Sequence, residues 1–493
     1  METQATSRIS RRQFIFTNAR IDAPAGWCSI ELGIGFFLYH CPLLNVVTAV
    51  DGSGQRWGLL GHAFEIATDH DDPIAGIARS PTQDIPKLVA TWSGRWLLLC
   101  PSALVTDAGA LLGAYILESD RGVIISGSLA LLSQLTGVPV RDSRIIGWYG
   151  FNWFPGPLCK LDSVRRLLPD QIYNSESRCI KFFNRLPALS NVSLNEAAEM
   201  LIGGLTQVFR AMSRQGDEKP MFLALTAGLD SRTNFAVLQA SGVPFTTLTL
   251  QHPRISRADA KLPPTISSAY HIIHRYIAGD KLLRDKLDQY DRHTHRCVVD
   301  GDRHFYARGN YESFGQQGWL IRSGCWELGR KYFHTKLRGL TLEELLDRPD
   351  RLMMRFRTFF GIKASADSVR EWARWRLEHP VAIPWQDLFY RDQRLGGWLS
   401  SIEQSLDLID PISIHPVNCD HFYRLLLGSE GNYGSQTAAL QHGIIARCAP
   451  DLKSVPINPS LDGRYFATRN IFLKIAAIAG GEFKNLLRLL MPS

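Results

Sequence analysis

Short apolar runs separated by turn-forming residues dominate the first part of the chain. Between about residues 14 and 140, runs such as 46–50 and 96–99 consist of apolar and β-branched residues, and Gly, Asp and Ser stand between them. Helical stretches are expected at residues 85–91 and 129–136. This pattern predicts an α+β region that is rich in antiparallel strands.

The pattern changes after residues 151–170, a segment with several prolines that is expected to connect two domains, with the boundary near residue 185. Beyond it, helices alternate with short apolar runs, which is typical of a buried parallel sheet. Ser193 and Glu196 have the spacing of a capping box at the start of a helix. The predicted elements are a helix at 194–212, a strand at 221–225, a helix at 231–240 that is ended by Gly242, and a strand at 245–250.

A loop of small residues joins the predicted strand at 221–225 to the next helix. Its sequence is Thr226-Ala227-Gly228-Leu229-Asp230-Ser231, which is not a Walker loop because it lacks Gly-Lys-Ser/Thr. Free backbone N–H groups, the helix dipole and the hydroxyls of Thr226 and Ser231 would attract an anion. Asp230 would repel a phosphate unless its carboxylate held Mg²⁺. The alternative is an ordinary strand-to-helix turn in which Asp230 and Ser231 cap the helix.

The loop resembles the pyrophosphate loop, Ser-Gly-Gly-X-Asp-Ser, of ATP-pyrophosphatase domains. Its surroundings resemble the asparagine synthetase-like superfamily. In that family a second strand follows, then an Asp before a helix, here Asp259, and later a Gly-X-Gly-X-Asp-Glu motif that ends in an aromatic residue, here residues 323–332. The resemblance implies that Asp230 and Glu327 share one Mg²⁺, which would neutralise a pyrophosphate leaving group. The alternative for Glu327 is an ion pair with Arg330 on a helix surface.

Parts of the first 185 residues resemble the glutaminase-like domain of the same superfamily. The similar segments are 92–96, 106–109, 126–132 and 161–170. The resemblance implies an Ntn-type β-sandwich domain at residues 1–185 and an α/β ATP-pyrophosphatase domain with a helical extension at 186–493. The family nucleophile is an N-terminal Cys, whereas Glu2 follows Met1 here and the first Cys is Cys28. We therefore expect that glutamine hydrolysis is lost.

Family members without this nucleophile include the β-lactam synthetases and the cyclases that close lasso peptides. The resemblance to them implies an ATP-dependent ligase that forms an acyl-adenylate, releases pyrophosphate and then makes an amide. The expected partners are a small-molecule or peptide carboxylate and amine, with a precursor peptide as one candidate. A catalytically lapsed scaffold subunit is the second hypothesis, because Ala227 replaces a loop Gly and the nucleophilic Cys is missing. The retained Asp230, Ser231 and Glu327 argue against it, although Glu327 replaces an expected Asp. Adenylation for RNA thiolation would need a Cys pair, and the sequence has no CxxC.

The resemblance also assigns roles to particular residues. ATP is expected to contact the loop and its neighbours, namely Leu225, Thr226, Ala227, Gly228, Leu229, Asp230, Ser231, Arg232, Leu250, Asp259 and Gly324. The candidate catalytic residues are Arg330, Tyr332, Arg394 and Lys453, with Tyr390 as a further acid–base candidate; a solvated surface position is the alternative for each. His271 and His274 have a ligand-like spacing, but they are expected to be packed helix residues.

Composition narrows the classes of function. The 493 residues include 55 Lys and Arg and 47 Asp and Glu, and this mild net charge of +8 fits either an anionic ligand such as ATP or a scattered surface excess. No basic run suggests a nucleic-acid-binding arm. The nine Cys form no CxxC motif, which argues against zinc and favours reduced thiols in a cytoplasmic protein. No apolar run is long enough to span a bilayer, and the amphipathic tail at 471–491 is expected to pack on the protein body.

Overall fold

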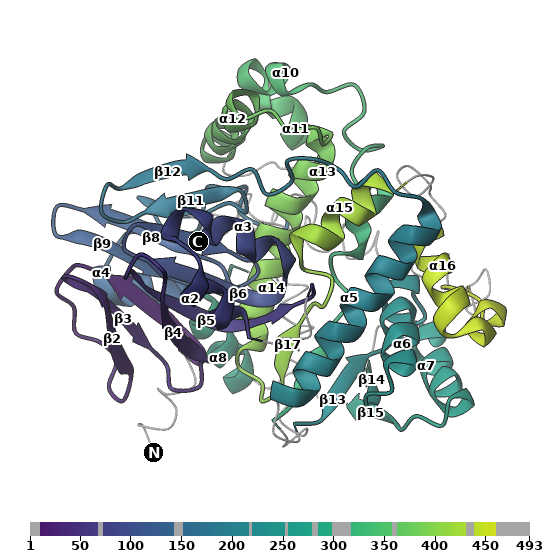
Figure 1. Ribbon diagram of the computed structural model, residues 1–493. Helices are drawn as coiled ribbons and strands as arrows, with labels where there is room; N and C mark the ends of the chain where they lie inside the picture. The colour runs from purple at the N-terminus through teal and green to yellow at the C-terminus, as the bar shows by residue number, and fades with distance from the viewer. Residues whose placement is uncertain are drawn as a thin grey trace.

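The N-terminal part of the protein is a sandwich of two six-stranded antiparallel sheets (Figure 1). The computed structural model describes residues 10–67, 72–141, 151–215, 219–251, 255–278, 284–297, 317–356, 362–429 and 438–459. The first sheet has the order β10 (Val164–Arg166), β8 (Tyr115–Ser119), β9 (Gly122–Ser126), β1 (Phe14–Thr17), β3 (Phe36–His40) and β2 (Cys28–Gly33). The second has the order β12 (Cys179–Phe182), β11 (Gln171–Asn174), β7 (Ala103–Thr106), β6 (Trp92–Cys100), β5 (Arg56–Glu65) and β4 (Val46–Val50).

The central strands of the sandwich are buried on both faces. Phe14 and Phe16 of β1 enter the core between the sheets together with Leu97 and Leu99 of β6, whereas Ile15 packs on the outer face. Every residue of β1 and of β6 is buried. Strands buried on both faces read as continuous apolar runs instead of alternating with polar residues.

Short helices cover the outer faces of the sandwich. Helix α4 (Leu129–Thr136) lies on the first sheet, where Leu129 and Leu132 pack near Ile15. Helices α2 (Pro73–Arg79) and α3 (Ile85–Leu88) lie on the second sheet, against Trp57 and Trp96. The 3-10 turns η1 (Thr82–Asp84) and η2 (Val89–Thr91) flank α3.

The proline-containing segment at 151–170 is more than a connection between domains. Its residues 164–166 form β10, the edge strand that pairs with β8 in the first sheet. The prediction of a purely connecting segment is therefore wrong, because strand pairing over about fifty residues leaves no local signal in the sequence. The domain boundary near residue 185 stays a prediction.

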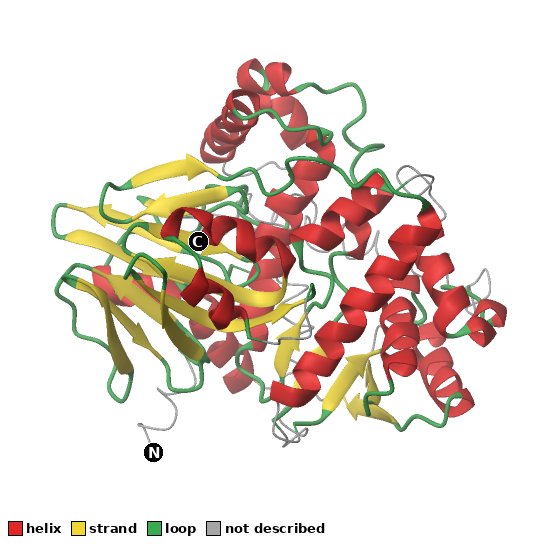
Figure 2. Cartoon of the chain, in the orientation of Figure 1, coloured by secondary structure: helices red, strands yellow, loops and turns green. Residues whose placement is uncertain are grey.

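A third sheet, with five strands, lies beyond the sandwich and is entirely parallel (Figure 2). Its order is β15 (His274–Ala278), β14 (Thr246–Gln251), β13 (Met221–Ala224), β16 (Trp319–Ile321) and β17 (Ile412–Ile414). Parallel neighbours need crossover connections, and α6 (Leu229–Ser241) and α7 (Arg257–Ala269) supply them on the β14 and β15 side. The mixed α/β architecture expected from the sequence is confirmed.

The remaining helices belong to the part of the chain that follows the sandwich. They are α5 (Leu194–Gln215), α8 (Arg284–Thr294), η5 (Trp326–Arg330), α10 (Leu342–Asp347), α11 (Pro349–Arg355), α12 (Ile362–Glu378), α13 (Trp385–Phe389), the π-helix η6 (Tyr390–Leu399), α14 (Ser400–Leu406), α15 (Asp420–Gly428), α16 (Ala439–Cys448) and η7 (Pro450–Ser454). Helix α5 begins where predicted, and Ser193 accepts the N–H of Glu196 at 3.2 Å. Gly242 ends α6 as predicted, with a φ of 73° that suits glycine.

The two histidines at 271 and 274 do not lie on a helix. His271 has a φ of 57° in the turn that follows α7, and His274 begins β15. The Nδ1 atom of His274 lies 2.9 Å from the hydroxyl of Thr247 on the adjacent strand. The prediction of packed helix residues is wrong, because α7 ends at Ala269 and the chain returns to the sheet.

Buried ion pairs join the sandwich to the parallel-sheet part. Arg95 of β6 lies 2.6 Å from Asp407, which follows α14. Arg185, just after the last strand of the sandwich, lies 2.9 Å from Asp420 at the start of α15, and both side chains are fully buried. Burial raises the pKa of Asp420, although Arg185 opposes the shift. Removing one partner while the two parts stay packed would leave the other charge unpaired in a poorly solvated place.

A third ionic group lies at the same junction. Asp170 of the sandwich pairs with Arg376 of α12 and with Arg391 of the π-helix, and both arginines also contact Asp392. Burial opposes ionisation of Asp170, but the two arginines lower its pKa to about 2. The junction is therefore built from complementary charges as well as apolar contacts.

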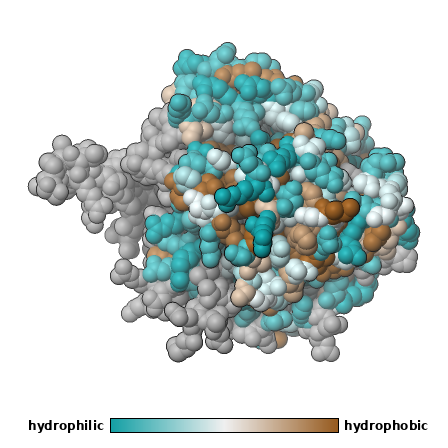
Figure 3. Space-filling model, turned by 90° about the vertical axis from the view of Figure 1, so that its left-hand side faces the viewer, coloured by the Kyte–Doolittle hydropathy of each residue, from teal (hydrophilic) through white to brown (hydrophobic). Residues whose placement is uncertain are grey.

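The surface of the sandwich is mixed in character. Figure 3, which views the molecule from this side, shows hydrophobic patches among hydrophilic ones. Exposed apolar side chains here include Ile34, Leu43, Val47 and Val50. Within the described ranges, no helix is both long and apolar enough to cross a membrane. The tail at 471–491 lies outside the described residues.

The buried pair Arg185–Asp420 generates a stability prediction. Arg185→Met is expected to lower the free energy of unfolding by about 3–5 kcal/mol, because it leaves the Asp420 carboxylate buried without its partner. Urea unfolding followed by circular dichroism measures the loss. The control is Arg165→Met, which removes a pair with Glu371 whose side chains are 39% and 49% exposed, and should cost less than about 1 kcal/mol. Equal losses in the two variants would contradict the assigned role of the junction.

Candidate functional site

A cavity of about 780 Å³ lies at the carboxyl ends of β13, β16 and β17. The chain runs from β13 to β14 and β15 on one side of the sheet and then to β16 and β17 on the other. The loops after β13 and β16 therefore diverge, and ligands of parallel sheets bind at such switch points. The π-helix η6, helix α16 and the segment 457–458 complete the walls.

The loop after β13 is held by its own side chains. The N–H of Thr226 donates to Ser231 Oγ at 3.1 Å, that of Gly228 donates to Thr226 Oγ1 at 3.1 Å, and that of Ala227 donates to Asp259 at 2.8 Å. The expectation that the loop N–H groups are free is therefore wrong for these three residues. Gly228 is the N-cap of α6 and has no side chain to cap the helix. The N–H groups that can attract an anion are those in the first turn of α6, whose residues line the cavity.

Asp230, in that first turn, belongs to a charged cluster. Its Oδ2 accepts a hydrogen bond from Arg330 at 2.8 Å, and its Oδ1 accepts one from the amide of Gln441 on α16 at 2.5 Å. The same Arg330 nitrogen lies 3.8 Å from Glu327. Burial raises the pKa of Asp230, while Arg330 acts in the opposite direction. Two carboxylates from different elements thus converge on one cation.

Glu327 is also held by Tyr390, the first residue of the π-helix. The hydroxyl of Tyr390 donates to Glu327 Oε2, and burial together with this carboxylate raises the pKa of Tyr390 well above its ordinary value. The ring of Tyr332 packs beside that of Tyr390, with centroids 5.2 Å apart. The sequence left two possibilities for Glu327, a metal ligand or an ion pair with Arg330. Glu327 does lie 3.8 Å from Arg330, and it also lines the cavity.

A buried histidine fixes the loop after β16. The N–H of Gly324 donates to Nδ1 of His415 at 2.9 Å, and Nε2 of His415 lies 2.9 Å from Glu403. Since an N–H can donate only to an unprotonated nitrogen, His415 is neutral with its proton on Nε2. Burial lowers the pKa of His415, which favours the same state although Glu403 opposes it. A Cβ at Gly324 would stand 2.7 Å from the imidazole, so the close approach requires glycine.

The π-helix η6 also contributes to the cavity wall. π-Helices are rare and occur mostly at functional sites. Eight of its ten residues are buried, and the two that are not, Arg394 and Trp398, both line the cavity. The guanidinium of Arg394 lies 3.5 Å from the centre of the Trp398 ring, and it donates to the amide oxygen of Asn152 at 3.3 Å.

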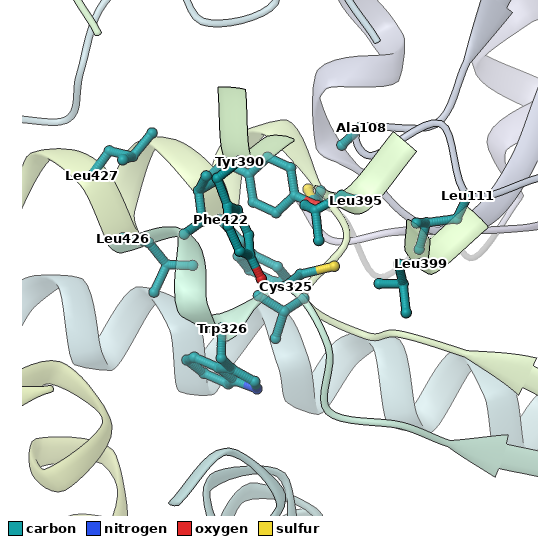
Figure 4. Close-up of a cluster of buried hydrophobic side chains, with 14 of the residues drawn as sticks. Ala108, Leu111, Cys325, Trp326, Tyr390, Leu395, Leu399, Phe422, Leu426 and Leu427 are labelled. Atoms are coloured by element: carbon teal, nitrogen blue, oxygen red, sulfur yellow. The ribbon is translucent and has the colours of Figure 1, made fainter. Parts of the chain in front are cut away.

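An apolar cluster supports these elements from behind. Figure 4 shows Cys325 of the β16 loop packed with Tyr390, Leu395 and Leu399 of the π-helix, and Leu111 of the sandwich lies beside them. The sandwich therefore contributes directly to the core beneath the cavity.

Arg232 ties the loop after β13 to a segment near residue 456. Its guanidinium donates to the carbonyls of Val455 and Pro456, each at 2.7 Å, and to that of Ala227 at 3.0 Å. The N–H of Asn458 donates to the same carbonyl of Ala227 at 3.0 Å. Arg232 thus holds the loop after β13 against the segment 455–456.

The structure brings many of the predicted site residues together. Those that line the cavity are Thr226, Gly228, Leu229, Asp230, Ser231, Gly324, Glu327, Arg330 and Arg394. Leu225 and Ala227 are buried in the loop, and Leu250 lies in β14. Asp259 contacts the loop through Ala227. Lys453 is exposed on η7 and is not among the residues that line the cavity, so the structure does not bring it to the site.

Several lining residues were missed by sequence reasoning. They are Arg322, His415, His442, Asn458 and, in contact with Asp230, Gln441. They reach the site through long-range folding, and none of them stands in a motif. Gly324 was recognised in the sequence, but its contact with His415 became visible only in the three-dimensional structure.

No family model matches the chain, and no curated protein matches it in sequence. It is similar to a solved structure described as glutamine-dependent NAD+ synthetase from Acinetobacter baumannii in complex with adenosine diphosphate (ADP), with a TM-score of 0.21 and 12% sequence identity. The similarity covers 44% of this chain and 50% of that chain, so it spans half the length of the other protein. At so low a TM-score it identifies neither the fold nor the activity of this protein.

The contact between His415 and Gly324 generates a prediction. His415→Leu is expected to destabilise the protein by about 1–3 kcal/mol, because it leaves the Gly324 N–H without its acceptor. His415→Asn, which retains an acceptor, should cost less. Urea unfolding gives the stabilities, and amide exchange of ¹⁵N-labelled Gly324 should be faster in the leucine variant. Unchanged exchange at Gly324 would show that the histidine does not hold the loop.

Proposed function

We propose that the cavity binds ATP and that the protein uses it to activate a carboxylate for amide-bond formation. The observation that carries the proposal is the convergence of Asp230 and Glu327 on one cation beside the N-terminus of α6. The cavity volume, about 780 Å³, falls within the range of about 300–1,000 Å³ that is usual for small-molecule sites.

The first turn of α6 supports phosphate binding. Backbone N–H groups at a helix N-terminus and the helix dipole favour an anion. Gly228 at the N-cap leaves this end open, and Ser231 lines the cavity beside it. Arg330 adds a cation that faces the same space.

The residues present also fit Mg²⁺. Asp230 and Glu327 lie 2.8 and 3.8 Å from one nitrogen of Arg330, so their oxygens already surround a positive charge. Mg²⁺ prefers oxygen ligands and is usually bound by one or two carboxylates together with phosphates and water. No cluster of three or more metal-ligating side chains occurs in the described part of the chain. When bound, the ion would neutralise charge on the phosphates.

The proposed reaction has two steps. A carboxylate oxygen attacks the α-phosphorus of ATP, the bond to the bridging oxygen breaks, and pyrophosphate leaves. An amine nitrogen then attacks the acyl carbon, gives up a proton and displaces AMP. Arg330 would stabilise negative charge on the phosphates, and the open turn of α6 would orient them.

The sandwich is proposed to be an Ntn-type, glutaminase-like domain that no longer hydrolyses glutamine. Its two antiparallel sheets with helices on both outer faces support this assignment. Just before β1, Arg12 is buried and donates to the carbonyls of Ile409 and Pro411, and Gln13 donates to Asp407. Arg12 and Gln13 therefore form hydrogen bonds between the sandwich and the parallel-sheet part. The amine is accordingly proposed to come from a substrate.

Nucleotide binding tests the proposal directly. Asp230→Asn is expected to weaken Mg²⁺–ATP binding, measured by calorimetry, by about tenfold or more, because a charged contact is lost. The control is Asp367→Asn on α12, whose side chain is 58% exposed. ATP-dependent pyrophosphate release with a panel of acids and amines tests the chemistry. Unchanged ATP binding in Asp230→Asn would contradict the proposal, and binding without release for any acid would favour a catalytically lapsed homologue.

The environment of Asp230 predicts a pH dependence. Since burial raises its pKa, the carboxyl takes up a proton at a higher pH than an ordinary Asp, near 3.9. Metal binding requires the ionised form. Mg²⁺–ATP affinity should therefore be full at high pH and fall as the pH decreases through the raised pKa. Calorimetry across this range should show a flatter profile in Asp230→Asn, and identical profiles would refute the assignment.

A further inference from the structure

Arg394 and Trp398 stand out because of where the π-helix directs them. Figure 4 shows Tyr390, Leu395 and Leu399 in the buried cluster. Arg394 and Trp398, the two residues of the helix that are not buried, line the cavity. They are four positions apart, and the guanidinium stacks on the indole at 3.5 Å. The pair is held against a rigid support, since the other eight residues of the helix are buried.

Arg394 differs from the other arginines of the cavity in the kind of group that it contacts. Three arginines line the cavity in the described part of the chain. Arg322 pairs with Glu403, and Arg330 pairs with Asp230. The contacts of Arg394 are to uncharged groups, the amide oxygen of Asn152 and the Trp398 ring. A cation in a partly desolvated site is stabilised by an anion, which the ligand can supply.

The shape of the pair favours a carboxylate on an organic molecule. A guanidinium fork matches the two oxygens of a planar carboxylate, and the indole shields one face of the fork from water. Trp398 and Leu399 add apolar surface to the cavity beside the guanidinium. Phosphate binding is proposed at the N-terminus of α6, a different element of the cavity lining. The anion for Arg394 is therefore expected to be the acid and not the nucleotide.

We propose that Arg394 and Trp398 form the subsite that binds the carboxylate of an organic acid with an apolar or aromatic substituent. This inference rests on the proposed function, because it places the second substrate of the same cavity. It also changes the role expected for Arg394, from stabilising phosphates to recognising the acid. Trp398 orients the guanidinium and contacts the substituent.

The test compares the binding of an acid with that of its uncharged amide analogue. N-acetyl-L-phenylalanine and N-acetyl-L-phenylalaninamide differ only in the carboxylate, and α,β-methylene-ATP with Mg²⁺ fills the nucleotide site without releasing pyrophosphate. By saturation-transfer NMR and calorimetry, the acid should bind the wild-type protein about tenfold more tightly than the amide, as a charged hydrogen bond allows. Arg394→Gln should reduce this preference to less than about threefold. Arg394→Lys should keep only part of it, because Lys retains the positive charge but lacks the planar fork of Arg.

Controls separate this inference from the proposed function. Arg374→Gln, an exposed arginine of α12 outside the cavity, should leave the acid preference intact. Affinity for α,β-methylene-ATP should change by less than about threefold in Arg394→Gln, since the phosphates bind elsewhere. Equal binding of acid and amide by the wild type, or of neither, would overturn the subsite, as would an equal loss of nucleotide affinity in Arg394→Gln. Failure of the wild type to bind the nucleotide would instead contradict the proposed function.

Discussion

The buried ion pairs between the sandwich and the parallel-sheet part are the interaction on which the rest of the structure depends. Arg95, Asp170 and Arg185 of the sandwich each meet an opposite charge from the second part. A pair of this kind adds little to stability relative to apolar packing, but breaking it is costly. It therefore selects one relative placement of the two parts over all others.

That placement matters because the anchoring residues are interleaved with the residues of the cavity. Arg391 holds the π-helix to Asp170, Asp392 pairs with Arg391 beside it, and Tyr390 and Arg394 stand on either side of these two residues. Asp407 follows Glu403 by one helical turn, and Asn418 and Asp420 follow His415. The sandwich thus supports the site from behind.

The sequence was informative where structure is local. The apolar run at 221–225, the small-residue loop and Gly242 each act over a few residues, so the strand, loop and helix could be predicted. Asp230 and Glu327 were singled out through motif resemblance, and Arg394 as a cation of the helical half; all three line the cavity. Pairings between distant segments could not be predicted in this way, which is why β10, His415 and Gln441 were missed. His271 and His274 show the opposite error: a helix-like spacing was overridden by the end of α7 and the return to the sheet.

The π-helix has a consequence for how this segment can vary. Each residue turns a helix by a fixed angle, about 100° in an α-helix and less in the wider π-helix, so adding or removing one residue turns everything beyond it. Loss of a single position between Tyr390 and Leu399 would change which of the following residues face the cavity and which are buried. The number of residues in this stretch is therefore constrained as strictly as their identity. Substitutions can be accommodated one at a time, whereas an insertion or deletion changes the whole wall at once.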